Sequence, residues 1–197
     1  MSFERLRLAC PSAIALVQYL AFLNPDEILL DFLKGGIEAL PSKIQMLIEN
    51  NFRRIESLNA LESFSLIRVF GEGRKISIHR LVQAVIQDDL ESSQRGLIIS
   101  DIIRLGLHSF PDLSDESNRE ICRRYQSQVI ACLEQGDSAK FGSEWHILAG
   151  RVAFYLREDG FYMDCLHWWR WTFDIRVRTL GPEHPDTLQT SNIIRNA

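Results

Sequence analysis

One run near the C-terminus limits the fold more than any other feature of the sequence. Residues 179–188 read TLGPEHPDTL and lie between one amphipathic helical pattern and the start of another. Gly181 permits the left-handed conformation that ends a helix, and the two prolines of the run cannot continue one. Asp186 or Thr187 can then cap the next helix. The run therefore predicts a sharp turn between two helices.

The segment before this turn has the apolar spacing of two paired helices. The first ends at Gly160, and the second reaches Leu180. Small residues at Cys165 and Thr172 allow paired helices to approach closely. Together with the turn, residues 146–187 form a 42-residue unit that resembles a degenerate tetratricopeptide repeat, plausible as the first of an array.

The resemblance implies that a second repeat begins after the turn and is cut short at Ala197. We expect the chain to be a piece of a longer protein or a truncated gene product, with the exposed face of Leu188, Ile193 and Ile194 available for self-association. Within the repeat, the residues expected to form the core are Trp145, Val152 and Phe173. The residues expected to serve interaction are Trp145, Trp168, Trp169 and Trp171.

The composition argues against several classes of protein. A formal net charge of -4 and a pI near 5.8 disfavour a chain whose main work is binding nucleic acid or an acidic membrane. No apolar run reaches the roughly 18 residues needed to span a bilayer, and charged residues stand where a signal peptide has its apolar segment. The four cysteines show no CxxC spacing. We therefore expect reduced, buried thiols in a cytoplasmic protein.

The first half of the chain predicts helices followed by a hairpin. A first helix carries Leu6 and Leu8, and Pro11 opens a second. Asn24-Pro25-Asp26-Glu27 reads as the start of a third helix that carries Ile28 and Leu29. Pro41-Ser42 introduces a fourth helix that reaches Phe52. A separate short helix is expected over residues 57–64.

Two β-rich runs follow, residues 66–70 and residues 75–78, joined by the turn Gly71-Glu72-Gly73-Arg74. A closing helix begins at His79, and its residues at helical spacing are Leu81, Val82, Val85, Ile86 and Leu90. Helix, hairpin and helix in this order predict a winged-helix module.

Two segments of the first half carry a second resemblance. Residues 60–67 (ALESFSLI) and residues 76–86 (ISIHRLVQAVI) are similar to the winged-helix region of fungal NB-ARC proteins with tetratricopeptide repeats. Those proteins are NOD-like receptors of the STAND NTPase class, and the winged helix follows their nucleotide-binding domain. Residues 21–28 and the Phe110-Pro111 break match the same family. The resemblance implies a regulatory segment of a signal-transducing receptor.

In related receptors, a Met-His-Asp motif opens the helix after the hairpin, and its histidine touches the phosphates of ADP. The matching positions are Ile78, His79 and Arg80, so the third residue departs from the motif. The first turn of a helix presents unpaired N–H groups that suit a phosphate. The alternative is that His79 only caps the helix or packs beside the hairpin. The resemblance thus implies that His79 contacts ADP only when a P-loop domain is present.

Motifs for chemistry on this chain are missing from the sequence. No Gly-Lys dipeptide occurs, so there is no Walker A loop to hold a triphosphate. The five histidines fit no metal spacing with the cysteines, and no Gly-x-Ser-x-Gly motif accompanies the serines. We expect no catalytic residue, no metal and no cofactor on this chain, with ADP or ATP bound only in a full-length parent.

These observations predict a mainly α fold, with a winged-helix-like domain over residues 1–95, a helical connector over residues 96–142, and a TPR-like repeat with a half-repeat over residues 143–197. The predicted function is a non-catalytic, regulatory and protein-interaction segment whose partners are an NB-ARC domain and further TPR repeats, not nucleic acid or membrane. Two alternatives stay open, a DNA-binding winged helix and a free-standing TPR scaffold. The stretch 57–64 offers Glu62 and no Lys or Arg, which argues against DNA. Arg68, Arg74 and Lys75 on the wing could touch phosphates, but these contacts are few and the chain is acidic.

Overall fold

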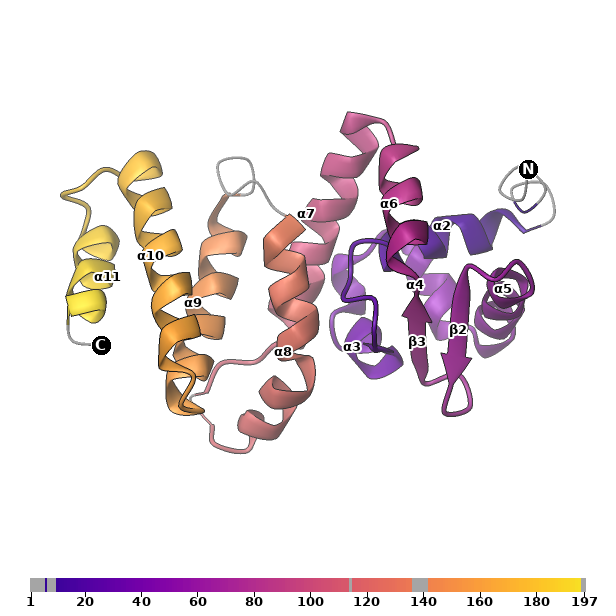
Figure 1. Cartoon of the computed structure of the whole chain (residues 1–197), viewed down its shortest axis with the longest axis horizontal. Coiled ribbons are helices and arrows are strands. Elements are labelled where there is room, and N and C mark those ends of the chain that lie inside the picture. Colours follow the sequence, from indigo (N-terminus) through magenta and orange to yellow (C-terminus); the bar gives the residue numbers. More distant parts are fainter. Residues whose placement is uncertain (1–5, 7–9, 114, 136–141, 196–197) are drawn as a thin grey trace. The chain divides into compact units, whose positions relative to one another are not determined.

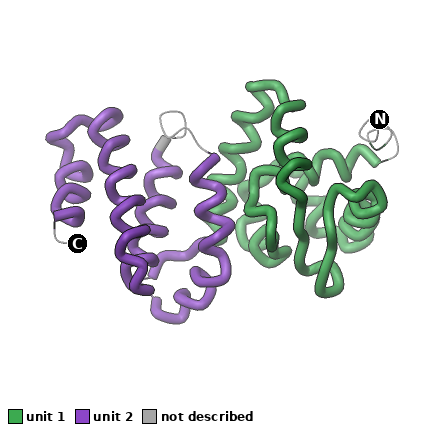
Figure 2. Tube along the Cα trace, viewed as in Figure 1, with its two compact units in different colours: residues 1–109 green, residues 110–197 purple. Residues whose placement is uncertain are grey.

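The computed structural model describes residue 6 and residues 10–113, 115–135 and 142–195. The chain divides into two compact units, residues 1–109 and residues 110–197 (Figure 2). The fold is mainly helical with one small antiparallel sheet, as the sequence predicted. Leu8 of the predicted first helix lies outside the described residues, whereas Leu6 is helical and buried.

Unit 1 places a three-stranded sheet among short helices (Figure 1). Its elements in chain order are α2 (Pro11–Leu20), β1 (Ile28–Leu29), α3 (Leu30–Gly35), the 3-10 helix η1 (Ile37–Ala39), α4 (Ser42–Glu49), α5 (Asn51–Ser63), β2 (Ile67–Phe70), β3 (Lys75–Ile78), α6 (Arg80–Asp88) and α7 (Ser92–Ser109). Helices followed by a hairpin and a further helix give unit 1 a winged-helix-like order.

The sheet corrects one sequence prediction. Ile28 and Leu29 form strand β1 and not the start of a helix, and Ile28 pairs with Ile76 of β3. The side chain of Asn24 accepts a hydrogen bond from the Asp26 backbone N–H at 3.0 Å, which makes a local turn in place of a helix cap. The strand order is β1-β3-β2, so β3 is central.

A second correction concerns the helices before the hairpin. The Asn50 side chain accepts a hydrogen bond from the Arg53 backbone N–H at 3.0 Å, so a new helix begins there and runs to Ser63. The stretch 57–64 is therefore not a separate helix, and Phe52 lies on α5, not on α4. As a consequence, the helix before the hairpin carries two arginines that the prediction did not assign to it.

Helix α7 belongs to unit 1, so the predicted boundary after residue 95 does not coincide with the division between the units. It packs against α3 and η1. At Gly36 a Cβ atom would lie 2.4 Å from the backbone oxygen of Leu105, so only glycine permits this approach. The Ser109 hydroxyl donates to the Phe32 carbonyl at 2.7 Å and completes the contact.

Unit 2 is a series of helices, each packed against the next. Its helices are α8 (Asn118–Gln135), α9 (Gly142–Glu158), α10 (Tyr162–Thr179) and α11 (Pro185–Arg195). Gly181 has a φ of 93°, as predicted for the turn. The residue that caps α11 is His184, whose Nδ1 accepts a hydrogen bond from the Asp186 backbone N–H at 3.3 Å, and not Asp186 or Thr187.

No helix among the described residues is both long enough and apolar enough to cross a membrane.

Candidate functional site

A groove of about 820 Å³ opens on the surface of unit 1 and contains the predicted site residue His79. Three stretches of chain line it: the loop before β1, the passage from α5 into β2, and the passage from β3 into α6. The lining residues are Pro25, Asp26, Glu62, Ser65, Leu66, Ile67, Arg68, Ser77, Ile78, His79, Arg80 and Val82. The groove therefore brings together both segments on which the sequence resemblance depends.

His79 is the N-cap of α6 and is exposed. Its Nδ1 accepts a hydrogen bond from the Leu81 backbone N–H at 3.2 Å. An imidazole nitrogen that accepts a hydrogen bond carries no proton, so in the neutral ring the proton sits on Nε2. His79 thus caps the helix, as one sequence interpretation held, while its other nitrogen remains a donor.

The two arginines of the groove differ in whether they form an ion pair. Arg80 pairs with Asp26 at 3.3 Å, and both side chains are largely exposed, so the pair contributes little to stability. Arg68 lies opposite Ser77 in the sheet register, is exposed, and makes no ion pair within the described part of the chain. Arg68 is therefore the cation of the groove that remains available to a ligand. The sequence named Arg68 only as a wing residue that could touch DNA phosphates, and not as a neighbour of His79.

One rim of the groove carries backbone strain. Ser65 has a φ of 56°, in the left-handed region that non-glycine residues rarely adopt. Its N–H bonds to the Glu62 carbonyl at 2.8 Å, and the N–H of Leu66 bonds to the Leu61 carbonyl at 3.1 Å. These bonds end α5 and turn the chain into β2. The strain is part of how the groove is shaped.

The groove carries charges of both signs, with Arg68 and Arg80 beside the carboxylates of Asp26 and Glu62. Asp26 is paired with Arg80, and Glu62 accepts a hydrogen bond from the Val69 backbone N–H. The groups left to meet an anion are the His79 imidazole N–H, the Arg68 guanidinium and the positive end of α6. Three or more His, Cys, Asp or Glu side chains do not gather into a metal-binding group anywhere in the described residues.

Three of the four cysteines are buried thiols with little nucleophilic character. Burial raises the pKa of Cys122 to about 11, and burial also raises the pKa of Cys132 and Cys165. A thiol with a raised pKa carries little thiolate near neutral pH. Cys10 is half-buried, and its sulfur lies 3.3 Å from the Ser12 hydroxyl.

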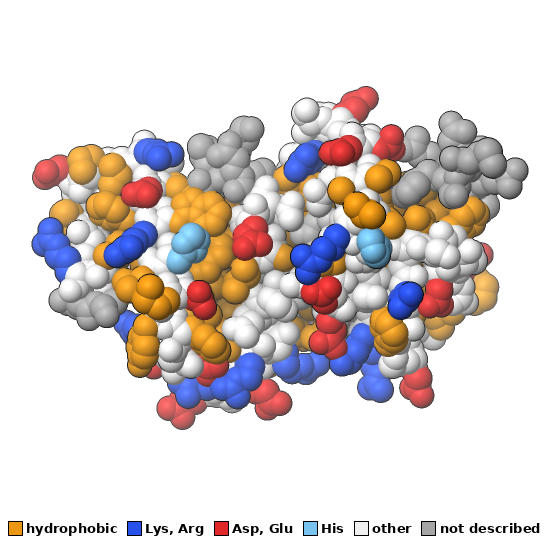
Figure 3. All heavy atoms as spheres, viewed as in Figure 1, with side chains coloured by type: hydrophobic (Ala, Val, Ile, Leu, Met, Phe, Trp, Pro, Cys, Tyr) orange, Lys and Arg blue, Asp and Glu red, His pale blue; other side chains and the backbone are white. Residues whose placement is uncertain are grey.

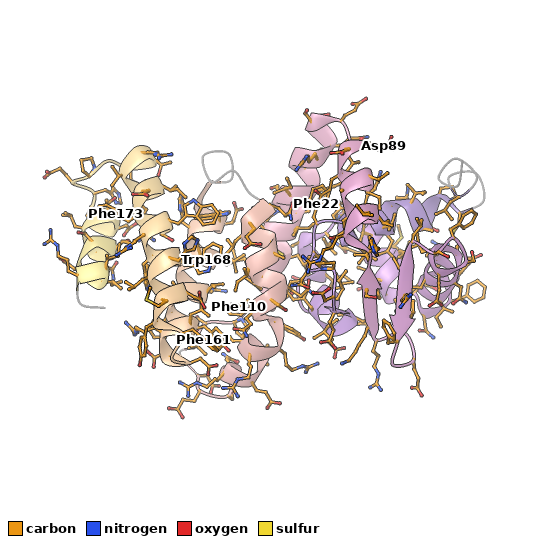
Figure 4. All side chains as sticks on the ribbon, in the orientation of Figure 1. Phe22, Asp89, Phe110, Phe161, Trp168 and Phe173 are labelled. Atoms are coloured by element: carbon orange, nitrogen blue, oxygen red, sulfur yellow. The ribbon has the colours of Figure 1, made fainter. Side chains whose placement is uncertain are left out.

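Three of the four tryptophans predicted as interaction residues are buried inside unit 2, among them Trp168, which is labelled in Figure 4. Trp145 is fully buried, and its Nε1 donates to the Leu133 carbonyl at 3.2 Å. Trp168 and Trp169 are buried, and Trp171 is half-buried and stacks on Trp168 with ring centroids 5.2 Å apart. Three of the four therefore serve packing, because a buried ring offers no surface to a partner. Of the predicted core, Val152 is buried, and Phe173 is half-buried.

Two exposed apolar surfaces were not predicted from the sequence. Leu81 and Val85 of α6 point to solvent, because Gln83 and Gln87 hold this helix to unit 1 by donating to the carbonyls of Leu23 and Ala21 at 2.8 and 2.6 Å. Helical spacing predicts that a helix has an apolar face, but not whether this face packs against the core or points to solvent.

The second surface surrounds the turn between α9 and α10. We call it the turn patch: Phe154, Phe161, Tyr162 and Met163. In the sequence, the sign of this surface is the apolar run 161–163 directly after Gly160. The start of a helix with buried residues would give the same run, so the run alone does not predict an exposed surface.

Comparison with known proteins adds one similarity. Residues 1–95 match a family described as a domain of unknown function, DUF7779. The match lies within unit 1 and includes the whole groove. No curated protein matches the chain. No solved structure matches it either.

Proposed function

We propose that this chain is a non-catalytic, regulatory and protein-interaction segment of an NB-ARC and TPR receptor of the STAND type. In this proposal the groove of unit 1 faces the phosphates of a nucleotide that a separate P-loop domain holds, and unit 2 begins a helical repeat that binds a protein partner in the cytoplasm. Nucleotide is held by the P-loop domain and only touched by this chain.

The observation that carries the proposal is the double role of His79. Its Nδ1 is engaged in the cap of α6, so the ring is held in one orientation with Nε2–H directed away from the helix backbone. Arg68 lies in the same groove without an ion pair in the described residues. A fixed donor beside a free guanidinium suits a phosphate oxygen.

Unit 2 supports the second half of the proposal through its packing. Cys165 and Thr172 are buried on α10, which lies against α9. Arg176 of α10 donates to the Asp186 carbonyl at 3.0 Å and to the Thr190 hydroxyl at 2.7 Å, so α11 continues the series of packed helices. Pairs of helices joined by glycine-containing turns are the units from which helical repeats stack.

A DNA-binding winged helix is less well supported by α5. This helix carries Arg53 and Arg54, but Arg54 donates to the Ile48 carbonyl and to the Asn51 side chain. Its large exposed apolar side chains are Phe52 and Ile55, which cannot bind phosphates. The free-standing TPR scaffold remains the alternative if unit 1 proves to have no nucleotide-linked role.

The test replaces His79 in a receptor that retains its P-loop domain, with this chain in the place of the winged helix and first repeat. His79→Ala removes both the cap and the imidazole, whereas His79→Asp keeps a good cap and repels a phosphate. Both variants should lose ADP affinity by about tenfold to hundredfold, since a charge-assisted hydrogen bond contributes roughly 1.5 to 3 kcal/mol. ADP affinity that falls for Ala but is kept by Asp would reduce His79 to a helix cap.

A further inference from the structure

The turn patch of unit 2 is the most concentrated exposed apolar surface of the described chain. Phe154, Phe161, Tyr162 and Met163 have exposed fractions of 38, 45, 61 and 80% within ten residues. In Figure 3 hydrophobic side chains gather at the end of unit 2 where α9 joins α10, and Figure 4 labels Phe161 there. Contiguous surfaces of this kind mark interaction sites, whereas single exposed apolar residues do not.

The backbone beneath the patch is firmly held. Arg123 pairs with Asp159 at 2.7 Å, and the Tyr155 hydroxyl donates to the same carboxylate at 3.1 Å. The Arg157 guanidinium lies 4.7 Å from the centre of the Phe154 ring. Because this backbone is held by contacts within unit 2, a partner that binds the patch has to order only the exposed side chains.

The size of the patch indicates what kind of partner fits. A large apolar side chain offers roughly 200 Å², so the exposed fractions amount to about 450 Å² of apolar surface. A standard protein interface buries about 800 Å² on each partner, of which about 57% is apolar. The patch therefore supplies the apolar part of one standard interface with a folded surface, which is more than a short peptide needs.

The charges around the patch are of both signs. Arg157, whose guanidinium covers the Phe154 ring, bonds to the adjacent Glu158 at 3.0 Å, and Asp164 is exposed without an ion pair in the described residues. A two-fold dimer pairs two surfaces that each carry an arginine and an unpaired carboxylate. A surface that carries both an apolar centre and opposite charges at its edges is complementary to itself.

We propose that the turn patch is the surface through which two copies of this chain associate about a two-fold axis. This role is independent of the groove in unit 1. It also differs from the association through the C-terminal half-repeat that the sequence suggested. Among the large apolar side chains of α11, Leu188 is exposed, while Ile193 and Ile194 are half-buried.

The experiment measures the mass of the full chain by sedimentation equilibrium over a range of concentrations. Met163→Asp and Tyr162→Asp are suitable variants, because both positions lie in the first turn of α10, where an acidic residue stabilises the helix. Leu188→Asp and Met46→Asp are matched controls, with the native side chains 50 and 53% exposed outside the patch.

The wild-type chain and both controls should reach the mass of a dimer as concentration rises, and the two patch variants should weaken dimerisation by at least about thirtyfold, the effect of losing an interface hot spot. A wild-type chain that stays monomeric at every concentration overturns the proposal. Dimerisation that is lost in Leu188→Asp and kept in Met163→Asp also overturns it, and places the interface on α11.

Discussion

Two non-glycine residues in the described part of unit 1 adopt positive φ, and both lie near the hairpin. Ser65 precedes β2 with a φ of 56°, and Glu72 lies in the hairpin turn with a φ of 58°. A side chain in this region costs of the order of 1 kcal/mol relative to glycine. At Ser65 the cost is tolerated where α5 ends and the groove begins.

Replacing Ser65 by glycine should therefore stabilise the protein. We expect a gain of roughly 0.5 to 1 kcal/mol, because glycine adopts the left-handed conformation without steric cost. Urea denaturation followed by circular dichroism measures the change. Ser63→Gly is the matched control. Ser63 is the last residue of α5, so glycine at this helical position should lower the free energy of unfolding. Equal effects of the two substitutions would show that Ser65 is not strained.

A second residue-scale prediction concerns His146 of α9. Its Nδ1 is buried without a hydrogen-bond partner in the structure, and burial, together with the charge of Arg176, lowers its pKa. The unfolded chain therefore binds a proton more readily than the folded one. The stability contributed by the neutral ring is complete above a pH of about 6.5, the unfolded value, and is lost as pH falls below it.

Thermal unfolding between neutral and mildly acidic pH measures this effect. His146→Gln should flatten the decline in stability on acidification, because glutamine has no proton to gain. The same slope in the variant and in the wild-type protein would contradict the account of His146.

At the scale of elements, strand β2 is an edge of the sheet protected by a side chain. The Glu62 carboxylate accepts a hydrogen bond from the Val69 backbone N–H at 3.0 Å, on the side away from β3. An unprotected edge strand invites pairing with another chain. Glu62 thus satisfies the Val69 N–H of this edge strand and places a negative charge beside the strand.

Glu62→Ala should expose this edge, lower the free energy of unfolding by about 1 kcal/mol, and raise light scattering on mild heating. Glu62→Gln retains an amide oxygen that can accept the same hydrogen bond and should stay close to wild type in stability. An Ala variant as stable and as free of aggregates as the Gln variant would show that the contact at Val69 does not protect the edge.

The elements also show how far sequence reasoning reaches. The hairpin and the helices of unit 2 follow from turn chemistry and apolar spacing, which are local, and most of their bounds agree with the structure. Strand β1 was missed because two residues carry no periodicity, and pairing with β3 decides their conformation. Within the site, His79 was predicted from the family resemblance and from its place at a helix start. Arg68 was named only as a wing residue that could touch DNA phosphates, and Ser65 was not named, since only the fold brings these residues to the same groove.

At the scale of the whole molecule, the two proposed surfaces lie on different units. The groove belongs to unit 1, where the family match also lies, and the turn patch belongs to unit 2. Three of the four tryptophans expected to bind a partner instead lie in the interior of unit 2. Composition alone cannot separate a buried aromatic cluster from an exposed one, so the turn patch could be identified only from the exposed fractions of its side chains.

The most direct test of the proposed function is a titration of the isolated chain with ADP, followed by NMR of the His79 imidazole and by calorimetry. The groove offers a phosphate only a helix start, one imidazole and one free guanidinium, and the cradle of a P-loop is missing from the sequence. We predict shifts of the His79 signals that begin at millimolar ADP and vanish in Arg68→Gln, with no binding heat at micromolar concentrations. Sub-micromolar affinity would contradict the account by revealing a complete nucleotide site on this chain, and unperturbed His79 signals at saturating millimolar ADP would contradict the role of the groove.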